Sequence, residues 1–266
     1  MRVLVLGGTT EASLLADMLA ADPRFTATLS LAGVTRAPLL PRIGYRIGGF
    51  GGIDGLCNWL RIEGVAALID ATHPYAVQIS RNAAAAAARL GIARLRIDRP
   101  PWQPQPGDRW TRVRDADAAA EALGATPRRV LLTVGSKALA PFGRAPWHRY
   151  VVRCIDAPDP ALLPPGAELL LARGPFTLDA ELALLAEWRI DVLVSKNSGG
   201  SATAPKLEAA RRLGLPVLMI DRPSGTPDKA GGTPDEAGAA TAAQAMRWLS
   251  ERLHDRRLHD GAPRGA

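Results

Sequence analysis

An apolar run that leads directly into a glycine pair begins the chain and limits what it can fold into. Val3 to Leu6 are all apolar; Gly7-Gly8-Thr9-Thr10-Glu11 follows, and then a helix-forming run from Ala12 to Leu19. This order predicts a buried parallel strand that leads into the N-terminus of a helix. Glycines let a phosphate approach the backbone, and the free N–H groups and dipole of the helix attract its charge. We therefore expect residues 7–11 to bind a cofactor.

The turn departs from the complete G-x-G-x-x-G fingerprint of dinucleotide-binding folds. Glu11, Ala12 and Ser13 stand where further glycines would lie. The same tight strand-to-helix turn occurs in other α/β proteins, so the turn by itself leaves both interpretations open.

Composition narrows the class of protein. The 266 residues are 47% hydrophobic, enough for one large domain or two modest ones. The sequence has no apolar run of about eighteen residues and no charged-then-apolar leader, which favours a soluble cytoplasmic protein with no membrane partner. Cys57 and Cys154 are far apart in sequence and the four histidines have no ligand spacing, so we expect neither a disulfide nor a metal site.

The formal charge of +7 indicates an anionic partner. The basic residues are dispersed, and aromatic residues make up 5% of the chain without alternating with arginine along a strand. This pattern argues against a nucleic-acid surface. A small molecule with several carboxylates or phosphates is the preferred partner.

A second apolar and β-branched run, from Arg24 to Ala32, predicts the next strand. Nicotinamide-binding folds carry an acidic residue after this strand, which holds the ribose hydroxyl of NAD. Thr35 and Arg36 stand there instead and suit a 2′-phosphate, which favours NADP and makes Arg36 a candidate cofactor ligand. Arg36 as an ordinary solvated arginine remains the alternative.

Chemically active side chains gather after the strand predicted over residues 65–69. The loop reads Asp70-Ala71-Thr72-His73-Pro74-Tyr75-Ala76, and the carboxyl ends of parallel strands are where open α/β sheets bind ligands. His73 and Tyr75 are therefore candidates for chemistry. A structural role for His73, as a cap of the helix that continues over residues 83–90, stays open.

The second half of the sequence repeats the first. Asp98-Arg99-Pro100 has its echo in Asp221-Arg222-Pro223, each preceded by a similar Leu-Gly motif at the same distance. A duplicated α/β unit explains the echo, although helix–strand units share such patterns by chance as well. We expect an α/β fold of two Rossmann-like parallel-sheet domains, over residues 1–100 and 107–253, with a proline-rich linker, a surface insertion over residues 224–238 and a disordered tail over residues 254–266.

Two loops of the second half gain meaning from this repeat. Gly135-Ser136-Lys137 follows a predicted buried strand as the Gly8 turn does, and Lys196-Asn197-Ser198-Gly199-Gly200 occupies the place of the His73 loop. Both can cradle an anion with backbone N–H groups. The second loop is also consistent with a solvated connection whose helix is capped at Ser201 or Thr203.

Taken together, the motifs resemble the precorrin-6A reductases, the NADPH-dependent enzymes of corrin-ring (cobalamin) biosynthesis. The resemblance spans Arg2 to about Pro223. It rests on the motifs at residues 7–12, Ser30-Leu31-Ala32-Gly33, the loop at 70–76, Arg173-Gly174-Pro175-Phe176, and the loop at 196–200 with Ala202, Thr203 and Lys206. Gly135-Ser136-Lys137 departs from the Gly-Arg-Gln-like turn expected there, which makes Lys137 a less secure site residue.

The resemblance implies that cofactor and macrocycle bind in a cleft between the two domains. It implies hydride transfer from NADPH to a carbon–carbon double bond of precorrin-6A, a polycarboxylate tetrapyrrole, to give precorrin-6B. Candidate cofactor ligands are residues 7–11, Arg36, Gly135, Ser136, Lys137, Asn197, Ser198, Gly199 and Gly200. Candidate catalytic residues, which would supply a proton or orient the macrocycle, are His73, Tyr75 and Lys196.

Several alternatives stay open. Positioning of the cofactor alone could suffice for catalysis, with solvent delivering the proton. The chain could instead reduce cobalt-precorrin-6A, or be a regulatory protein that senses a nucleotide without turnover. Other enzymes of the cobalamin pathway are candidate partners.

Overall fold

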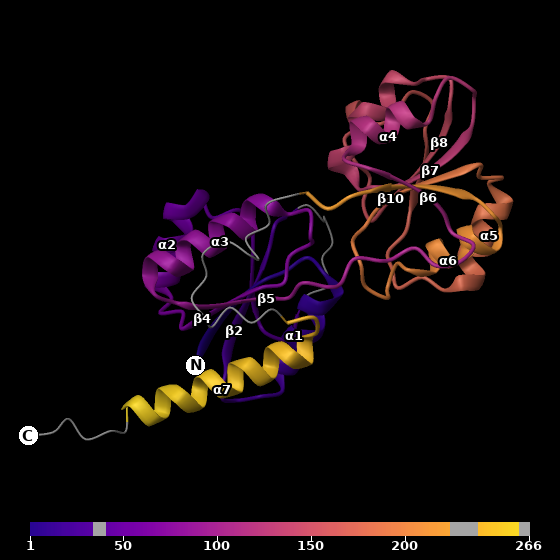
Figure 1. The fold of residues 1–266 in the computed structure, drawn as a ribbon. Coiled ribbons are helices and arrows are strands. Elements are labelled where there is room, and N and C mark those ends of the chain that lie inside the picture. Colours follow the sequence, from indigo (N-terminus) through magenta and orange to yellow (C-terminus); the bar gives the residue numbers. More distant parts are fainter. Residues whose placement is uncertain (34–40, 224–238, 261–266) are drawn as a thin grey trace, which may run out of the picture. The chain divides into compact units, whose positions relative to one another are not determined.

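The computed structural model describes residues 1–33, 41–223 and 239–260, which form two compact units (Figure 1). Unit 1 comprises Met1–Arg99 and Ser224–Ala266, and unit 2 comprises Pro100–Pro223. Each unit is built on its own parallel sheet. Arg36 and the insertion predicted over residues 224–238 lie outside the described residues.

Unit 1 holds a five-stranded sheet in the order β3-β2-β1-β4-β5, with parallel pairing throughout. Its strands are β1 (Arg2–Leu6), β2 (Thr26–Leu31), β3 (Gly44–Ile47), β4 (Ala67–Asp70) and β5 (Ala93–Arg96). Its helices are α1 (Thr10–Ala20), α2 (Gly52–Ile62), α3 (Val77–Leu90) and α7 (Ala242–Asp260).

Strand β1 is apolar and buried from Val3 to Leu6 because helices cover both faces of the sheet (Figure 1). Val3 and Val5 pack on the side of α1 and α7, whereas Leu4 and Leu6 pack on the side of α2 and α3. The predicted strand and helix at the start of the chain are confirmed, with Thr9 as the N-cap of α1.

Unit 2 holds a six-stranded parallel sheet in the order β6-β11-β10-β7-β8-β9. Its strands are β6 (Arg109–Val113), β7 (Arg129–Thr133), β8 (Arg149–Cys154), β9 (Glu168–Leu171), β10 (Val192–Lys196) and β11 (Pro216–Ile220). Its helices are α4 (Ala116–Ala122), α5 (Leu178–Glu187) and α6 (Pro205–Arg212), with short 3-10 turns η1 (Ser136–Ala138), η2 (Ala140–Arg144) and η3 (Pro160–Leu162).

The two sheets share one strand order. Read outward from its edge, the series β9-β8-β7-β10-β11 in unit 2 repeats the series β3-β2-β1-β4-β5 in unit 1. In unit 1 the central strand β1 lies between β2 and β4, and in unit 2 the corresponding strand β7 lies between β8 and β10. The predicted pair of parallel-sheet α/β domains is thereby confirmed.

The last helix was assigned to the wrong unit in the sequence-based prediction. We expected it in the second domain, but Ala245 and Leu249 of α7 are fully buried in the same core as Val3 and Leu19 of unit 1. The helix also continues to Asp260, so residues 254–260 are helical and not a disordered tail. Residues 261–266 lie outside the described residues.

In both units, a segment followed by a helix pairs beside the strand that would otherwise end the sheet, and this accounts for the position of α7. In unit 2, β6 pairs in parallel with the outer edge of β11 and is followed within three residues by α4. In unit 1, Ala239 makes a parallel bridge to Ile97, just beyond β5, and is likewise followed within three residues by α7. An open sheet edge favours such cover, and unit 1 obtains it from a distant part of the chain.

Unit 2 also buries a group of charged side chains. Arg153 Nη1 donates to Glu181 Oε1 at 2.6 Å, with the two side chains 5% and 1% exposed. Lys206 is 4% exposed, and its Nζ lies 5.4 Å from the centroid of the Trp102 ring. Burial, reinforced by the like charge of Arg153 and opposed by Glu181, lowers the pKa of Lys206 to about 7.

This buried lysine makes stability depend on pH. Because its pKa lies below the ordinary value of 10.5, the unfolded chain binds more protons between these two values, so stability rises with pH there, by at most about 1.4 kcal/mol per pH unit from this group. We expect Lys206→Met to gain stability relative to the parent at pH 7 and to lose that relative gain towards pH 10, as measured by urea unfolding. Arg149→Met, which removes an exposed charge that does not titrate in this range, should show a constant difference; a constant difference for Lys206→Met would contradict the expectation.

Candidate functional site

The turn after β1 presents backbone N–H groups to open space. Gly8 has a φ of +112°, and a Cβ built on it meets nothing within 4 Å. Thr9 Oγ1 accepts from the N–H of Ala12 at 3.2 Å, which fixes the start of α1. Within the described part of the chain, the first N–H groups of the helix, at Thr10 and Glu11, have no protein acceptor, as is usual for a helix N-terminus. The turn therefore has the donors that a phosphate requires.

The loop after β4 lies directly beside this turn. Thr9 Oγ1 donates to the carbonyl of Ala71 at 2.7 Å, and Ala71 N donates to the carbonyl of Leu6 at 2.9 Å. Strands β1 and β4 are parallel neighbours. After β1 the chain continues to β2 on one side of the pair, and after β4 it continues to β5 on the other side. In open α/β folds this reversal of strand order marks the ligand site.

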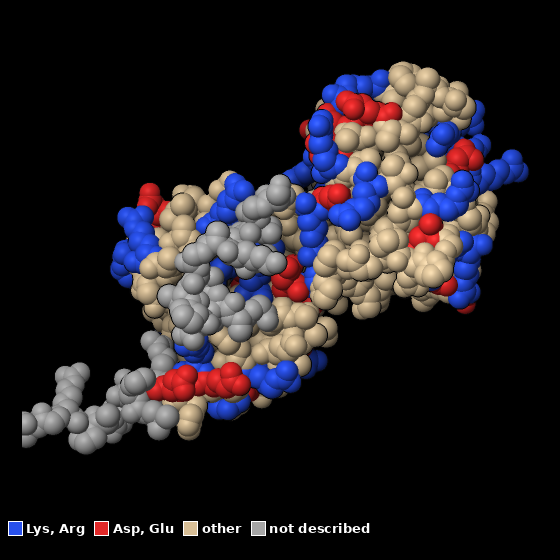
Figure 2. Space-filling view, in the orientation of Figure 1, with Lys and Arg blue, Asp and Glu red and all other residues tan. Residues whose placement is uncertain are grey.

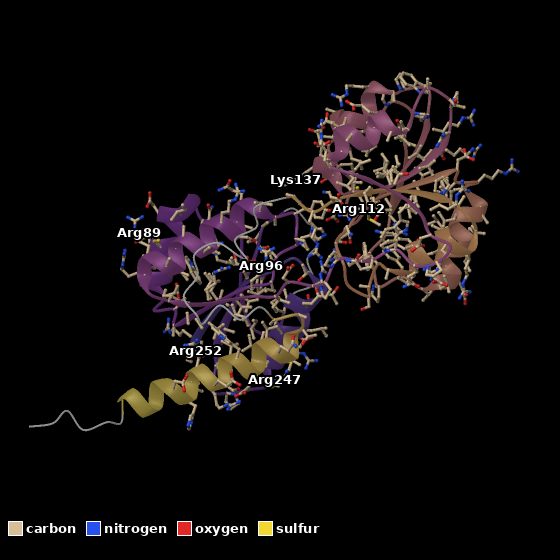
Figure 3. The ribbon with its side chains drawn as sticks, viewed as in Figure 1. Arg89, Arg96, Arg112, Lys137, Arg247 and Arg252 are labelled. Atoms are coloured by element: carbon tan, nitrogen blue, oxygen red, sulfur yellow. The ribbon has the colours of Figure 1, made fainter. Side chains whose placement is uncertain are left out.

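A buried polar network shapes the loop after β4. The carboxylate of Asp70, which is 0% exposed, accepts from the N–H and the hydroxyl of Thr72 at 3.2 and 2.7 Å. Ser80 of α3 lies 3.2 Å from the same hydroxyl, and Arg96 of β5 donates to the other carboxylate oxygen at 3.3 Å. Figure 3 shows Arg96 in the interior of unit 1. These partners fix the path of the loop that carries the predicted catalytic residues.

His73 and Tyr75 lie together in this loop. The N–H of Tyr75 donates to His73 Nδ1 at 3.3 Å, and the ring centroids are 5.4 Å apart. With Nδ1 as acceptor, a neutral His73 ring carries its proton on Nε2. The N-cap of α3 is Ala76, whose own side chain makes no capping hydrogen bond.

Unit 2 repeats this arrangement at the carboxyl ends of β7 and β10. Thr133 Oγ1 of β7 donates to the carbonyl of Val194 of β10 at 3.0 Å. Gly135, with a φ of +75°, opens the turn that contains Ser136 and Lys137. Burial and the positive charge of Lys137 both lower the pKa of Lys196, so the two ammonium groups are close enough to repel each other.

The loop after β10 is fixed by residues at its back. The Asn197 side chain accepts from the N–H of Trp102 at 2.7 Å and donates to the carbonyl of Trp102 at 3.1 Å. Arg222 donates to the carbonyls of Asn197 and Ser198 at 2.9 and 3.2 Å. Gly199 and Gly200 have φ of +65° and +84°, and within the described residues their N–H groups have no protein acceptor. This loop offers a second pair of donors for an anion.

The structure sorts the predicted site residues into two groups. The turn at residues 7–11 joins His73 and Tyr75 in unit 1, whereas Gly135, Ser136 and Lys137 join Lys196 and the loop at 197–200 in unit 2. Glu11 has a partner, since Arg99 Nη1 donates to its Oε2 at 3.0 Å. Arg99, Trp102 and Arg222 are site residues that were not predicted from the sequence; the repeated Asp-Arg-Pro motif is the signal that marks the two arginines.

Basic side chains are distributed over both units and mixed with acidic ones on the face shown in Figure 2. In the described residues no group of three or more His, Cys, Asp or Glu side chains could hold a metal ion. No described helix is both long and apolar enough to cross a membrane.

Comparisons with known proteins agree with this geometry. Residues 2–250 match the family described as Precorrin-6x reductase CbiJ/CobK. The precorrin-6A reductase of Rhodobacter capsulatus is 47% identical over 99% of both chains. A solved structure of CobK precorrin-6A reductase, also 47% identical, superposes with a TM-score of 0.85 over 100% of this chain and 99% of that one. The cobalt-precorrin-6A reductase of Priestia megaterium is 31% identical over 83% of this chain and 90% of its own. Both the sequence match and the shared two-sheet fold extend over nearly the whole chain, and this chain therefore belongs to the precorrin-6x reductase family CbiJ/CobK.

Proposed function

We propose that this protein reduces one carbon–carbon double bond of precorrin-6A with NADPH and so forms precorrin-6B. The observation that carries the proposal is the near-full-length similarity to the Rhodobacter capsulatus precorrin-6A reductase. The donor-rich turns at the strand ends of both sheets are its structural support.

The residues at the turn after β1 fit a dinucleotide cofactor. Gly8 leaves open space where a side chain would stand, and the N–H groups of Thr10 and Glu11 are available to phosphate oxygens. The N–H groups of Gly199 and Gly200 offer equivalent donors in unit 2. NADPH, when bound, supplies the hydride; the protein has to bind, orient and protonate.

Three side chains are suited to orienting the macrocycle or supplying its proton. Lys196 Nζ holds a proton that burial and Lys137 make easier to release, because both lower its pKa, and an acid whose pKa moves towards neutrality transfers its proton more readily. His73 Nε2 is the second candidate donor. The two ammonium groups also suit the carboxylate arms of a tetrapyrrole. The phenol of Tyr75 is the third candidate, and the backbone N–H of Tyr75 donates to His73 Nδ1 and so orients the imidazole ring.

The metal-free macrocycle is the favoured substrate. Identity is 47% to the Rhodobacter capsulatus precorrin-6A reductase and 31% to the Priestia megaterium cobalt-precorrin-6A reductase. Cobalt-precorrin-6A is therefore the comparison substrate in the test of function.

The proposed reaction can be tested directly. With precorrin-6A, we expect the purified protein to consume one NADPH per macrocycle, followed as loss of absorbance by the reduced nicotinamide, with slower turnover of NADH and of cobalt-precorrin-6A. Heat-unfolded protein is the control. Tight NADP⁺ binding without any oxidation of NADPH would refute the proposal and favour the nucleotide-sensing alternative.

Gly8→Ala tests the cofactor turn. A Cβ would stand in the open space in front of the turn, and the φ of +112° would strain any side chain. We expect NADP⁺ affinity, measured by calorimetry, to fall at least tenfold. Gly64→Ala is the control, because Gly64 also has a positive φ, of +59°, and open space around it, but it precedes the amino end of β4, away from the candidate site. An equal loss of NADP⁺ affinity in the control would assign the effect to backbone strain.

His73→Gln tests proton supply. If His73 delivers the proton, the single-turnover rate of NADPH oxidation should fall by about 100-fold or more, with NADP⁺ affinity unchanged. Gln78→Ala, an exposed change in the first turn of α3, should have no effect. An unchanged rate in His73→Gln would remove His73 from the catalytic residues and leave Lys196 or solvent as the donor.

A further inference from the structure

The two segments that join the units carry the same three-residue motif. Asp98-Arg99-Pro100 follows β5 and Asp221-Arg222-Pro223 follows β11, and the boundaries of the units fall at Arg99 and Pro223. The backbone of the two motifs is held alike, since Asp98 N donates to Ala239 and Asp221 N donates to Val113 of the neighbouring segment, both at 2.8 Å.

Each motif arginine contacts a ligand loop of its own unit. Arg99 Nη1 donates to Glu11 Oε2 at 3.0 Å, and the two side chains are 12% and 17% exposed. Glu11 lies in the first turn of α1, where its own backbone N–H and that of Thr10 are the candidate donors to an anion. This sheltered ion pair fixes the first turn of α1 and compensates a negative charge that would otherwise repel a phosphate.

Arg222 acts on the loop after β10 through carbonyl groups. Two of its hydrogen bonds go to the carbonyls of Asn197 and Ser198 and hold the backbone just before Gly199 and Gly200, whose N–H groups have no acceptor among the described residues. Gly199 is packed so closely that an added Cβ would lie 2.3 Å from the carbonyl oxygen of Pro100 and 3.0 Å from Arg222 Nη2.

Trp102 completes the support of the same loop. Its backbone N–H and carbonyl both bond to the side chain of Asn197, and its indole N–H donates to the carbonyl of Gly200 at 3.1 Å. The indole ring of Trp102 also lies near the ammonium group of the buried Lys206. The segment from residue 99 to residue 102 is thus anchored to a ligand loop of unit 1 at one end and to one of unit 2 at the other.

We propose that Arg99, Trp102 and Arg222 are positioning residues: Arg99 holds the turn after β1, and Trp102 and Arg222 hold the loop after β10, in the conformation that presents backbone N–H groups to an anionic ligand. The identity of that ligand rests on the proposed function; the positioning of the loops does not.

Hydrogen exchange resolved to single residues tests the positioning in the full-length protein without ligand. The reporters are amides whose bonds open when a loop loosens: Asn197 N, which donates to Ile220, and Ser198 N, which donates to Lys196, against Ser13 N, which donates to Thr9. Arg222→Met should speed exchange at 197 and 198 at least tenfold and leave Ser13 unchanged. Arg99→Met should do the reverse.

Matched controls remove other arginine contacts. Arg212→Met removes an exposed partner of Glu208 in unit 2, and Arg89→Met removes the exposed ion pair with Asp54 in unit 1, where Arg89 lies at the surface (Figure 3). Neither should change the reporters. Arg222→Lys should recover part of the protection, because an ammonium lacks the fork that serves two carbonyls. Should Arg222→Met fail to fold, Trp102→Phe, which keeps an aromatic ring of smaller size and removes the indole N–H that bonds to Gly200, should still speed exchange about threefold.

Binding of NADP⁺ separates this inference from the proposed function. Faster exchange with an NADP⁺ dissociation constant raised at least fivefold, and with KM for NADPH raised more than kcat is lowered, supports both. Faster exchange with unchanged NADP⁺ affinity supports the positioning and removes the loop from the cofactor site. Unchanged exchange in Arg222→Met, Arg99→Met and Trp102→Phe overturns the positioning, whatever happens to NADP⁺ binding.

Discussion

Burial of the central strands on both faces is the constraint on which the rest of the structure depends. Val3, Leu4, Val5 and Leu6 of β1 alternate between two cores, and Leu131 of β7 packs in the corresponding core of unit 2. A strand covered on both faces can present only its end to a ligand. The candidate site residues accordingly lie where β1, β4, β7 and β10 end, on turns in which some backbone N–H groups, such as those of Thr10 and Gly200, have no acceptor among the described residues.

Polar side chains form hydrogen bonds to the loops that follow the strand ends. In unit 1 the buried carboxylate of Asp70 is shared between Thr72 and Arg96, and Thr9 bridges two loops. In unit 2 the bonds from Arg222 and Asn197 have the same effect. Loops held in this way lose little conformational entropy when a ligand binds, so more of the interaction energy is retained as affinity.

The sequence predicted the parts of the fold that are set by local pattern and missed those that depend on distant contacts. The alternation of apolar strands, glycine turns and helices identified both sheets and the ends that carry the candidate site. Strand β6 was not predicted, because Arg109, Thr111 and Arg112 give an edge strand little apolar character. The position of α7 could not be read from residues 242–260, since what it covers, the α1 face of unit 1, lies more than two hundred residues away in sequence. Lys206 stood in a motif, but only the structure shows that it is buried beside Arg153 and Glu181.

Unit 1 is assembled from both sides of unit 2 in the sequence, and this has a consequence during synthesis. The ribosome releases β1 to β5 first, but Ala239 and the core residues of α7 appear only after unit 2 has been translated in full. Until then the edge of β5 lacks the bridge from Ala239 and the core of unit 1 lacks the side chains of α7, whereas unit 2 is one continuous stretch whose strands are all translated before α7. The turn after β1 is thus translated before unit 2, whereas the core that supports it is completed only after unit 2.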